Sequence, residues 1–144
     1  MDRSILKKIT LTPLKKISVE GGDVMHAIKK TDKEFRNFGE LYFSFINNGS
    51  VKAWKRHKKM TMNLFVPVGS VSFVFYDDVS KEFLNLEIGC ENYHRLTVPP
   101  GIIFGFKGKN KDQSLVVNFA DIPHNSNEIE KIKNEDIYFE WGKI

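Results

Sequence analysis

The sequence predicts an all-β fold, either a sandwich or a closed barrel. The main evidence for this fold class is a series of short segments rich in strand-forming residues, each bounded by Gly, Pro, Asn or Asp. The chain has 144 residues, of which 41% are hydrophobic and 12% aromatic. A chain of this length and composition can bury a core without help from a disulfide or a metal. Many short strands separated by turn signals are typical of sandwiches and barrels.

Turn signals separate the expected strands along the chain. Residues 40–46 are aromatic-rich and end at Asn47-Asn48-Gly49, which is a strong turn signal. The segment 71–76 closes in the same way at Asp77-Asp78. The expected strands are 40–46, 51–61, 62–68, 71–76, 83–88, 96–98, 102–106 and 115–119.

Only two stretches have helical character. Residues 32–38 form a short candidate, and residues 125–133 form a second one. Asn125 with Glu128 three residues later has the arrangement of a capping box. No repeat or linker interrupts the chain, so we expect a single domain over residues 1–144 with a short C-terminal helical segment.

Charge and cysteine content exclude several classes of protein. The net charge is +4, and its one concentration is the basic run at 52–59, which suits a phosphate-bearing ligand. Charge is the only feature of the sequence that supports nucleic-acid binding, so we consider a nucleic-acid partner unlikely. No apolar run is long enough to span a membrane, and the first eight residues lack the apolar centre of a signal peptide, so a cytoplasmic protein is expected. Cys90 is the single cysteine, which excludes an internal disulfide and a cysteine-based zinc site.

Two segments have the spacing of the cupin motifs. Residues 49–69 match the first motif at its two glycines, and Pro99-Pro100-Gly101 with the residues up to Phe104 matches the second. Lys55, Met62 and Phe104 stand where two His and one Glu would bind metal, which leaves only His57. The spacing of the two motifs predicts a cupin-type jelly-roll β-barrel. Three protein ligands are the usual minimum for a catalytic metal, so we expect no metal in this barrel, and we expect no cofactor.

Three stretches resemble the dTDP-4-dehydrorhamnose 3,5-epimerase family, whose members are metal-free cupins. Residues 91–106 resemble its "ENxRxLxIPxGFAHGF" segment, residues 49–55 its "GVLRGLH", and residues 19–24 its "DxRGxF". The resemblance implies a homodimer that acts on a nucleotide sugar in deoxysugar biosynthesis for surface polysaccharides. Such enzymes remove a proton α to a C4 ketone, which requires a base, a partner for the enolate oxygen and an acid on the opposite face.

Several functional positions of the family are changed in this chain. The family's base corresponds to Lys55 and its enolate-stabilising Lys to Met62, while the tyrosine acid falls in residues 120–123, which contain no Tyr. The Arg of "DxRG" is Gly21, and the Arg of "RGLH" is Lys52, which can still meet a diphosphate as a point charge. The family mechanism therefore cannot be transferred intact.

Strand alternation provides an independent interpretation of the basic run. If 51–61 is extended, one face of the strand is directed toward the barrel interior and carries Ala53, Lys55, His57 and Lys59. The other face carries Lys52, Trp54, Arg56 and Lys58. Confinement with other cations lowers the pKa of a lysine or histidine. We expect a rebuilt site in which His57 is the base and Lys55 stabilises the enolate, or the reverse. The alternative is a solvated basic strand that holds an anionic ligand.

Other polar residues are candidates for binding the substrate. His26, Arg95, Phe104 and Asn118 are the expected substrate-binding residues in addition to Lys52. Alternation turns Asn63 away from the cavity, which predicts a structural hydrogen bond. Asp121 and His124 flank a proline and are expected in turn or capping roles. Tyr138 could supply the missing acid, although packing is the commoner role for a tyrosine.

Two functions follow from these observations. The first is a nucleotide-sugar 3,5-epimerase or a related ketosugar isomerase. The second is the same barrel with its acid–base groups eroded, holding a nucleotide sugar or another anionic ligand without turnover.

Overall fold

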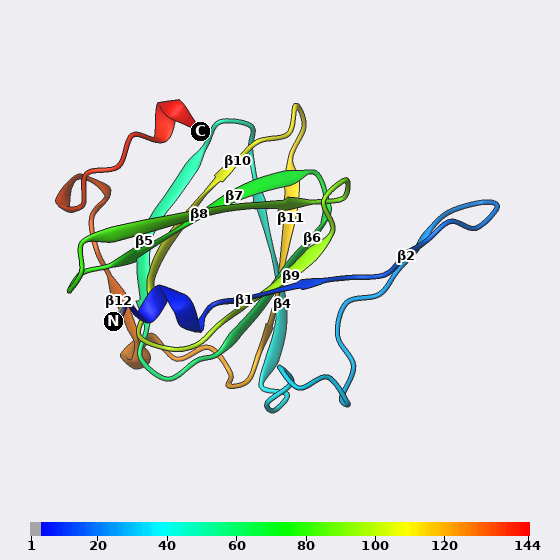
Figure 1. Ribbon diagram of the computed structural model, residues 1–144, viewed down its shortest axis with the longest axis horizontal. Coiled ribbons are helices and arrows are strands. Elements are labelled where there is room, and N and C mark those ends of the chain that lie inside the picture. The colour runs from blue at the N-terminus through cyan, green and yellow to red at the C-terminus, as the bar shows by residue number, and fades with distance from the viewer. Residues whose placement is uncertain (1–3) are drawn as a thin grey trace.

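Two five-stranded antiparallel sheets face each other in the computed structural model, which describes residues 4–144 (Figure 1). The first sheet has the order β1-β9-β6-β11-β4 and the second β12-β5-β10-β7-β8. This is the predicted all-β jelly roll. The strands are β1 (Thr10–Pro13), β4 (Glu40–Ile46), β5 (Val51–His57), β6 (Met62–Val68), β7 (Ser70–Asp77), β8 (Glu82–Gly89), β9 (His94–Val98), β10 (Ile103–Gly108), β11 (Ser114–Ala120) and β12 (Ile129–Lys131).

The hydrophobic core lies between the inner faces of the two sheets. Leu64 and Leu96 come from the first sheet, and Phe73 and Phe75 come from β7 of the second. All four are almost completely buried. Removing this much aromatic and aliphatic surface from water supplies the main driving force for closing the sheets on each other.

Gly69 lets the chain cross directly from the first sheet to the second between β6 and β7. Its φ is +90°, and a Cβ at this position would lie 2.2 Å from the Ser114 side-chain oxygen. Ser114 Oγ also accepts a hydrogen bond from the Ser70 backbone N–H. A side chain here would be strained and would collide with this contact, so only glycine fits the turn.

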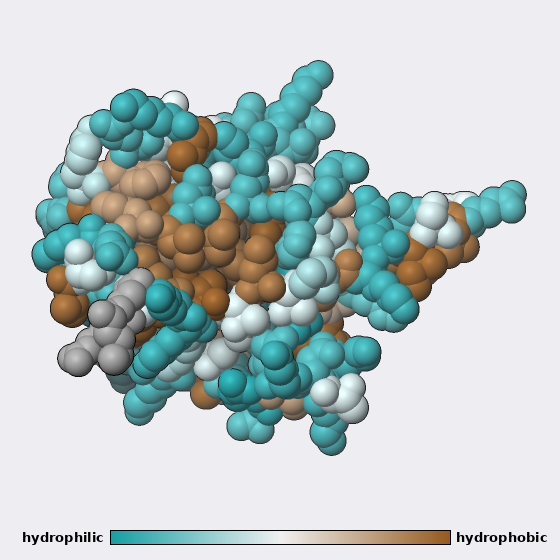
Figure 2. Space-filling view, in the orientation of Figure 1, coloured by the Kyte–Doolittle hydropathy of each residue, from teal (hydrophilic) through white to brown (hydrophobic). Residues whose placement is uncertain are grey.

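A two-stranded arm projects from the barrel (Figure 1). It consists of β2 (Lys16–Ile17) and β3 (Val24–Met25). Ile17, Val19 and Val24 are exposed on it, and Figure 2 shows hydrophobic surface on this arm. The arm therefore presents apolar side chains to solvent well away from the core.

The expected helices are the main departure from the sequence predictions. Residues 32–34 form a turn, and residues 35–38 have no regular secondary structure. The C-terminal helical segment consists of three short 3-10 turns, η2 (Ser126–Glu128), η3 (Asn134–Asp136) and η4 (Trp141–Lys143). Another 3-10 turn, η1 (Ile5–Lys8), lies near the start of the described residues. Asn125 caps η2 through the Asn127 N–H, but the chain then becomes β12 because it pairs with the edge of β5. The predicted helix over 125–133 was therefore wrong.

The strand expected over 51–61 is also shorter than predicted. It ends at His57, and the chain bends before β6 begins at Met62.

None of the helices in residues 4–144 combines the length and apolar character needed to cross a membrane.

Candidate functional site

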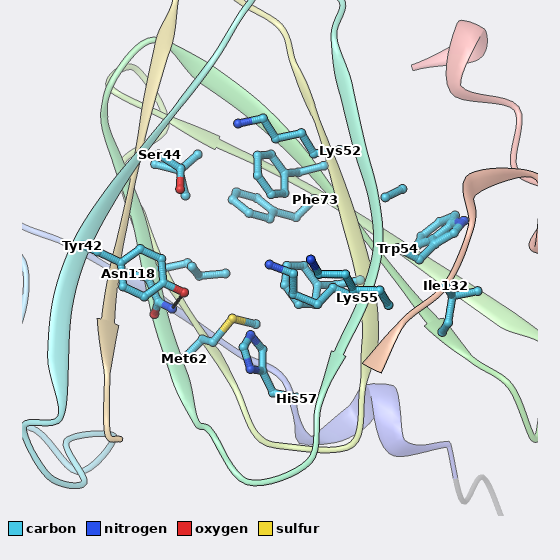
Figure 3. Close-up of a pocket in the computed structure, with 16 residues that line it drawn as sticks. Tyr42, Ser44, Lys52, Trp54, Lys55, His57, Met62, Phe73, Asn118 and Ile132 are labelled. Atoms are coloured by element: carbon cyan, nitrogen blue, oxygen red, sulfur yellow. Dashed lines mark hydrogen bonds between the residues drawn. The ribbon is translucent and has the colours of Figure 1, made fainter. Parts of the chain in front are cut away.

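A cavity of about 430 Å³ opens between the two sheets (Figure 3). One wall is formed by β5 and β10 of the second sheet and carries Lys55, His57 and Phe104. The facing wall is formed by β4 and β11 of the first sheet and carries Tyr42 and Asn118. This volume is in the range of small-molecule sites, and the polar groups of the two walls converge on it.

An irregularity in β5 decides which of its side chains enter the cavity. The pairing with β10 shifts between Phe104 and Gly105, so that Phe104 pairs with Lys55 but Gly105 pairs with Ala53. A Cβ on Gly105 would lie 2.6 Å from the Ala53 Cβ, so the missing side chain allows this close approach. Beyond the shift, Lys55 and His57 line the cavity as alternation predicted.

The same shift overturns the prediction for the start of β5. Lys52 was expected on the outer face, but it lines the cavity, with its ammonium 6.0 Å from the centre of the Phe106 ring. Ala53 borders the cavity and also packs against the outer cluster around Trp54. Simple alternation fails here because the extra residue of a bulge changes the face that the strand presents. Lys52 therefore reaches the cavity that contains Lys55 and His57.

A buried histidine–carboxylate pair lies at one end of the cavity. His57 Nδ1 is 2.7 Å from Glu128 Oε1, and the two side chains are 4% and 3% exposed. Glu128 Oε2 also accepts hydrogen bonds from the backbone N–H groups of Lys58 and Lys59. Burial opposes ionisation of Glu128, but the bond to His57 and these backbone donors outweigh it, so the pKa of the carboxyl is lowered.

The bond to Glu128 fixes the tautomer of the His57 imidazole. An ionised Glu128 accepts a hydrogen bond, so His57 Nδ1 must carry the proton, and Nε2 is the nitrogen left to act in the cavity. The Phe104 ring lies nearly parallel to the imidazole, with ring centres 6.1 Å apart. An imidazole held in one tautomer and one orientation is suited to accept a proton from a ligand.

Three lysines give the cavity a strongly positive wall. Lys52 and Lys55 come from β5, and Lys131 comes from β12 beside it, where it pairs in register with Lys55. Burial lowers the pKa of Lys55, and the neighbouring charges of Lys131 and Lys52 lower it further. Because these like charges repel one another, an anionic ligand would relieve the repulsion.

The facing wall carries a tyrosine–asparagine pair. Tyr42 and Asn118 are partners in the β4–β11 register, and Asn118 Nδ2 lies 2.9 Å from the Tyr42 hydroxyl. Burial raises the pKa of Tyr42, so the phenol stays protonated near neutral pH. Asn118 Oδ1 is buried and has no hydrogen-bond partner within residues 4–144.

Arg95 and His26 do not share this cavity. Arg95 is directed to the outer face of the first sheet, where its guanidinium contacts the Ala27 carbonyl at 2.7 Å, Glu34 Oε1 at 3.1 Å and Asp32 Oδ2 at 3.3 Å. His26 is exposed and lines a separate recess beside Arg95. His26, which was expected to line the same cavity as His57, and Arg95 therefore both lie apart from His57, because β9 turns Arg95 to the opposite face of its sheet.

The other predicted polar residues have structural surroundings. Asn63 faces away from the cavity and accepts a hydrogen bond from the Thr97 hydroxyl at 2.6 Å, as predicted. Asp121 accepts from the Thr61 backbone N–H, and His124 donates its backbone N–H to Glu40, in agreement with turn roles. Tyr138 is 78% exposed and bonds Glu140, so the cavity gains no acid from it.

Sequence reasoning missed three residues of the cavity site. Glu128 was assigned to a capping box, Tyr42 was grouped with core aromatics, and Lys131 was not singled out. Only the pairing of β12 with β5 brings Glu128 and Lys131 to the site. Met62 lies in the cavity wall as an apolar residue. No group of three or more His, Cys, Asp or Glu side chains within residues 4–144 is placed to hold a metal ion.

Comparisons with known proteins place these features in context. No protein-family model matches the chain. The structure of a dTDP sugar isomerase from Desulfovibrio desulfuricans G20 is 34% identical, with a TM-score of 0.90 over 100% of this chain and 97% of that one. The sugar 3,4-ketoisomerase QdtA from Thermoanaerobacterium thermosaccharolyticum, in complex with TDP, shares the fold at 18% identity and a TM-score of 0.75, over 92% of this chain and 93% of that one.

Two curated proteins are also similar in sequence. The probable low-salt glycan biosynthesis epimerase Agl13 of Haloferax volcanii is 31% identical over 84 residues, and the match spans 54% of this chain and 54% of that relative. The spore coat polysaccharide biosynthesis protein SpsL of Bacillus subtilis is 22% identical over 93% of this chain and 95% of its own length. The chain thus matches only about half the length of the first of these relatives.

Proposed function

We propose that this chain, which belongs to the family of dTDP-4-dehydrorhamnose 3,5-epimerases and related sugar isomerases, isomerises a nucleotide-bound 4-ketosugar. The observation that carries this proposal is the buried His57–Glu128 pair at the wall of a cavity lined by lysines. A base of this kind can remove a proton α to a ketone, and a positive wall can hold the anionic carrier of the sugar.

His57 is the base in this proposal. Its Nδ1–H is held by Glu128, so Nε2 accepts the proton from the carbon next to the ketone. The electrons of the broken C–H bond form a C=C bond, and the carbonyl becomes an enolate. Glu128 then stabilises the imidazolium that forms, as a buried carboxylate does for the histidine of a catalytic triad.

Lys55 stabilises the enolate oxygen. It is two residues before His57 on the same face of β5, and both side chains line the cavity. Of the two role assignments that the sequence left open, we take His57 as the base. Among the described residues, His57 has a carboxylate partner within 4 Å and Lys55 has none. A positive charge at the developing oxyanion is worth more in a partly buried site than in water.

The substrate's diphosphate is held by Lys52 and Lys131. Each lines the cavity beside Lys55, and each can pair with a phosphate oxygen as a point charge. Phe104 and Asn118 contact the sugar or its carrier from the two walls. The substrate class is that of the neighbours whose structures hold dTDP, TDP or a TDP-linked ketosugar.

We also propose that the protein acts in the cytoplasm as a homodimer. The exposed apolar residues of the β2–β3 arm, with Phe43 and Phe45 on the outer face of β4, are surfaces that a second copy would cover. Sedimentation equilibrium that returned the mass of a single chain would contradict the dimer.

A non-catalytic binding protein is the second candidate function. Met62 stands where the family has its enolate-stabilising lysine, and residues 120–123 contain no tyrosine. These two changes favour a barrel that holds a nucleotide sugar without turnover. The two candidates differ in one observable property, which is exchange of the α-proton with solvent.

The experiment is proton NMR of dTDP-4-keto-6-deoxyglucose in heavy water with the purified protein. We expect the C3 or C5 proton signal to disappear as deuterium enters from solvent. His57→Gln should abolish the exchange, while the matched variant of an exposed loop histidine, His124→Gln, should leave it unchanged. Saturation transfer to the nucleotide without any exchange would support the binding protein instead.

A further inference from the structure

Epimerisation inverts the carbon next to the ketone, so it needs a proton donor on the side of the sugar opposite the base, and the chain lacks a tyrosine where the family places it. The sequence contains four tyrosines, all within the described residues. Of these, only Tyr42 lines the cavity. Tyr76 packs in the outer cluster around Trp54, and Tyr138 is exposed.

Tyr42 lies on the wall that faces His57. It is part of β4 in the first sheet, whereas His57 is at the end of β5 in the second (Figure 3). A ligand in the cavity therefore lies between an imidazole on one side and a phenol on the other. This is the arrangement that removal of a proton from one face and its return to the other requires.

Asn118 leaves the phenol proton available. Its Nδ2 donates to the Tyr42 oxygen at 2.9 Å and contacts the sulfur of Met60 at 3.7 Å. Because the amide is the donor in this bond, the Tyr42 O–H proton is not used by it and can point into the cavity. The hydrogen bond from Asn118 Nδ2 also stabilises negative charge on the Tyr42 oxygen once the phenol proton has left.

Asn118 offers a second group to the ligand. Its Oδ1 is buried and has no hydrogen-bond partner among the described residues. A buried acceptor without a partner is costly, so it is normally satisfied by water or a ligand. A sugar hydroxyl that donated to Oδ1 would satisfy it and would hold the sugar next to the Tyr42 phenol.

We propose that Tyr42, held by Asn118, is the proton donor on the face of the sugar opposite His57. This proposal rests on the proposed function. In the step, His57 Nε2 takes the α-proton, and the C–H electron pair forms the enolate. The Tyr42 O–H then gives its proton to the carbon on the other face as the enolate collapses to the ketone. Tyr42 is left as the phenolate and His57 as the imidazolium, and exchange of one proton with solvent at each restores both.

Tyr42→Phe separates this role from binding and from the base. The variant removes one oxygen and keeps the ring, while His57 and Glu128 remain in place. In heavy water with dTDP-4-keto-6-deoxyglucose, we expect deuterium still to enter the α-position within about threefold of the wild-type rate. Formation of the isomerised sugar should fall by about 100-fold or more, which is the usual contribution of a general acid. Tyr138→Phe, an exposed tyrosine, should change neither rate.

The outcomes of this experiment are distinct. Isomerisation by Tyr42→Phe at the wild-type rate would overturn the proposal, and so would equal loss of exchange and isomerisation in a variant that still binds dTDP. If Tyr42→Phe fails to fold, Asn118→Leu provides the same test, with isomerisation reduced more than exchange as the expected result and equal rates as the contradicting one. A wild-type protein that binds dTDP without exchange would overturn the proposed function and this inference together.

Discussion

The protein has two buried clusters, each of which pairs a basic side chain with one or more carboxylates. One cluster borders the cavity between the sheets, and the other lies on the outer face of the first sheet. His57 and Glu128 are at the cavity, while Arg95 lies on the outer face of the first sheet and contacts Glu34 and Asp32 of the 27–36 segment. Arg95 and His57 are both almost fully buried. Burial and ion pairing therefore do not by themselves distinguish a reactive site from a structural one.

The difference lies in what each cation can still do. Glu128 occupies one nitrogen of His57 and leaves the other toward a cavity of about 430 Å³. Arg95 is held by one backbone carbonyl and two carboxylates, and arginine does not lose its proton at accessible pH. The first cluster can accept a proton, whereas the second anchors the segment that follows the β2–β3 arm to the sheet.

The largest effect that tests this comparison is expected from Glu128→Gln. Glutamine keeps the size of the side chain but can donate its amide N–H to His57 Nδ1, which places the ring proton on Nε2 and blocks the base. We expect α-proton exchange to fall by roughly 10²–10⁴-fold, in the range of general-base losses. Exchange is measured by NMR in heavy water, and affinity for dTDP is measured alongside. A variant that exchanges at the wild-type rate would show that the pair is structural, like the Arg95 cluster.

Arg95→Met is expected to act on stability instead. Removing the guanidinium leaves the buried Glu34 without its cationic partner, and loss of one member of a buried pair typically costs about 3–5 kcal/mol. Urea unfolding should show this loss, while Arg36→Met, an exposed arginine, should stay within about 0.5 kcal/mol. Affinity of the folded Arg95→Met protein for dTDP should be unchanged. A large loss of affinity without loss of stability would return Arg95 to the binding site.

The two clusters also show where prediction from the sequence succeeded. Strand periodicity and turn residues located most of the barrel strands, and alternation placed Lys55 and His57 in the cavity and turned Asn63 away from it. These features depend on the local two-residue repeat of a strand, which sequence carries directly. The same repeat misplaced Lys52, because a bulge changes the phase and leaves no local signal.

The partners of these residues depend on topology, which local patterns do not carry. Glu128 is 71 positions from His57, and its local sequence also fits a capping box. Arg95 is 61 positions from Glu34, and nothing near it indicates which face of the sheet it takes. Tyr42 stands in an aromatic strand whose alternate members face the cavity and the outside. Only the pairing of distant strands assigns these side chains to the cavity or to the outer face.

Lys55→Met is expected to have a smaller effect, which raises the stability of the protein and lowers its affinity for dTDP. Burial and the charges of Lys131 and Lys52 lower the pKa of Lys55, so the folded state holds the protonated amine less favourably than the unfolded chain does. This cost is fully present below the folded pKa and disappears as pH rises to the unfolded value near 10.5. At pH 7, Lys55→Met should therefore raise the urea midpoint, and its advantage over wild type should shrink as pH rises toward 10.5. Its affinity for dTDP should fall at the same time, because one of the three cavity lysines is gone. A variant that loses stability at pH 7 would show that Lys55 is neutralised by a group of the folded protein and is not held ready for an anionic ligand.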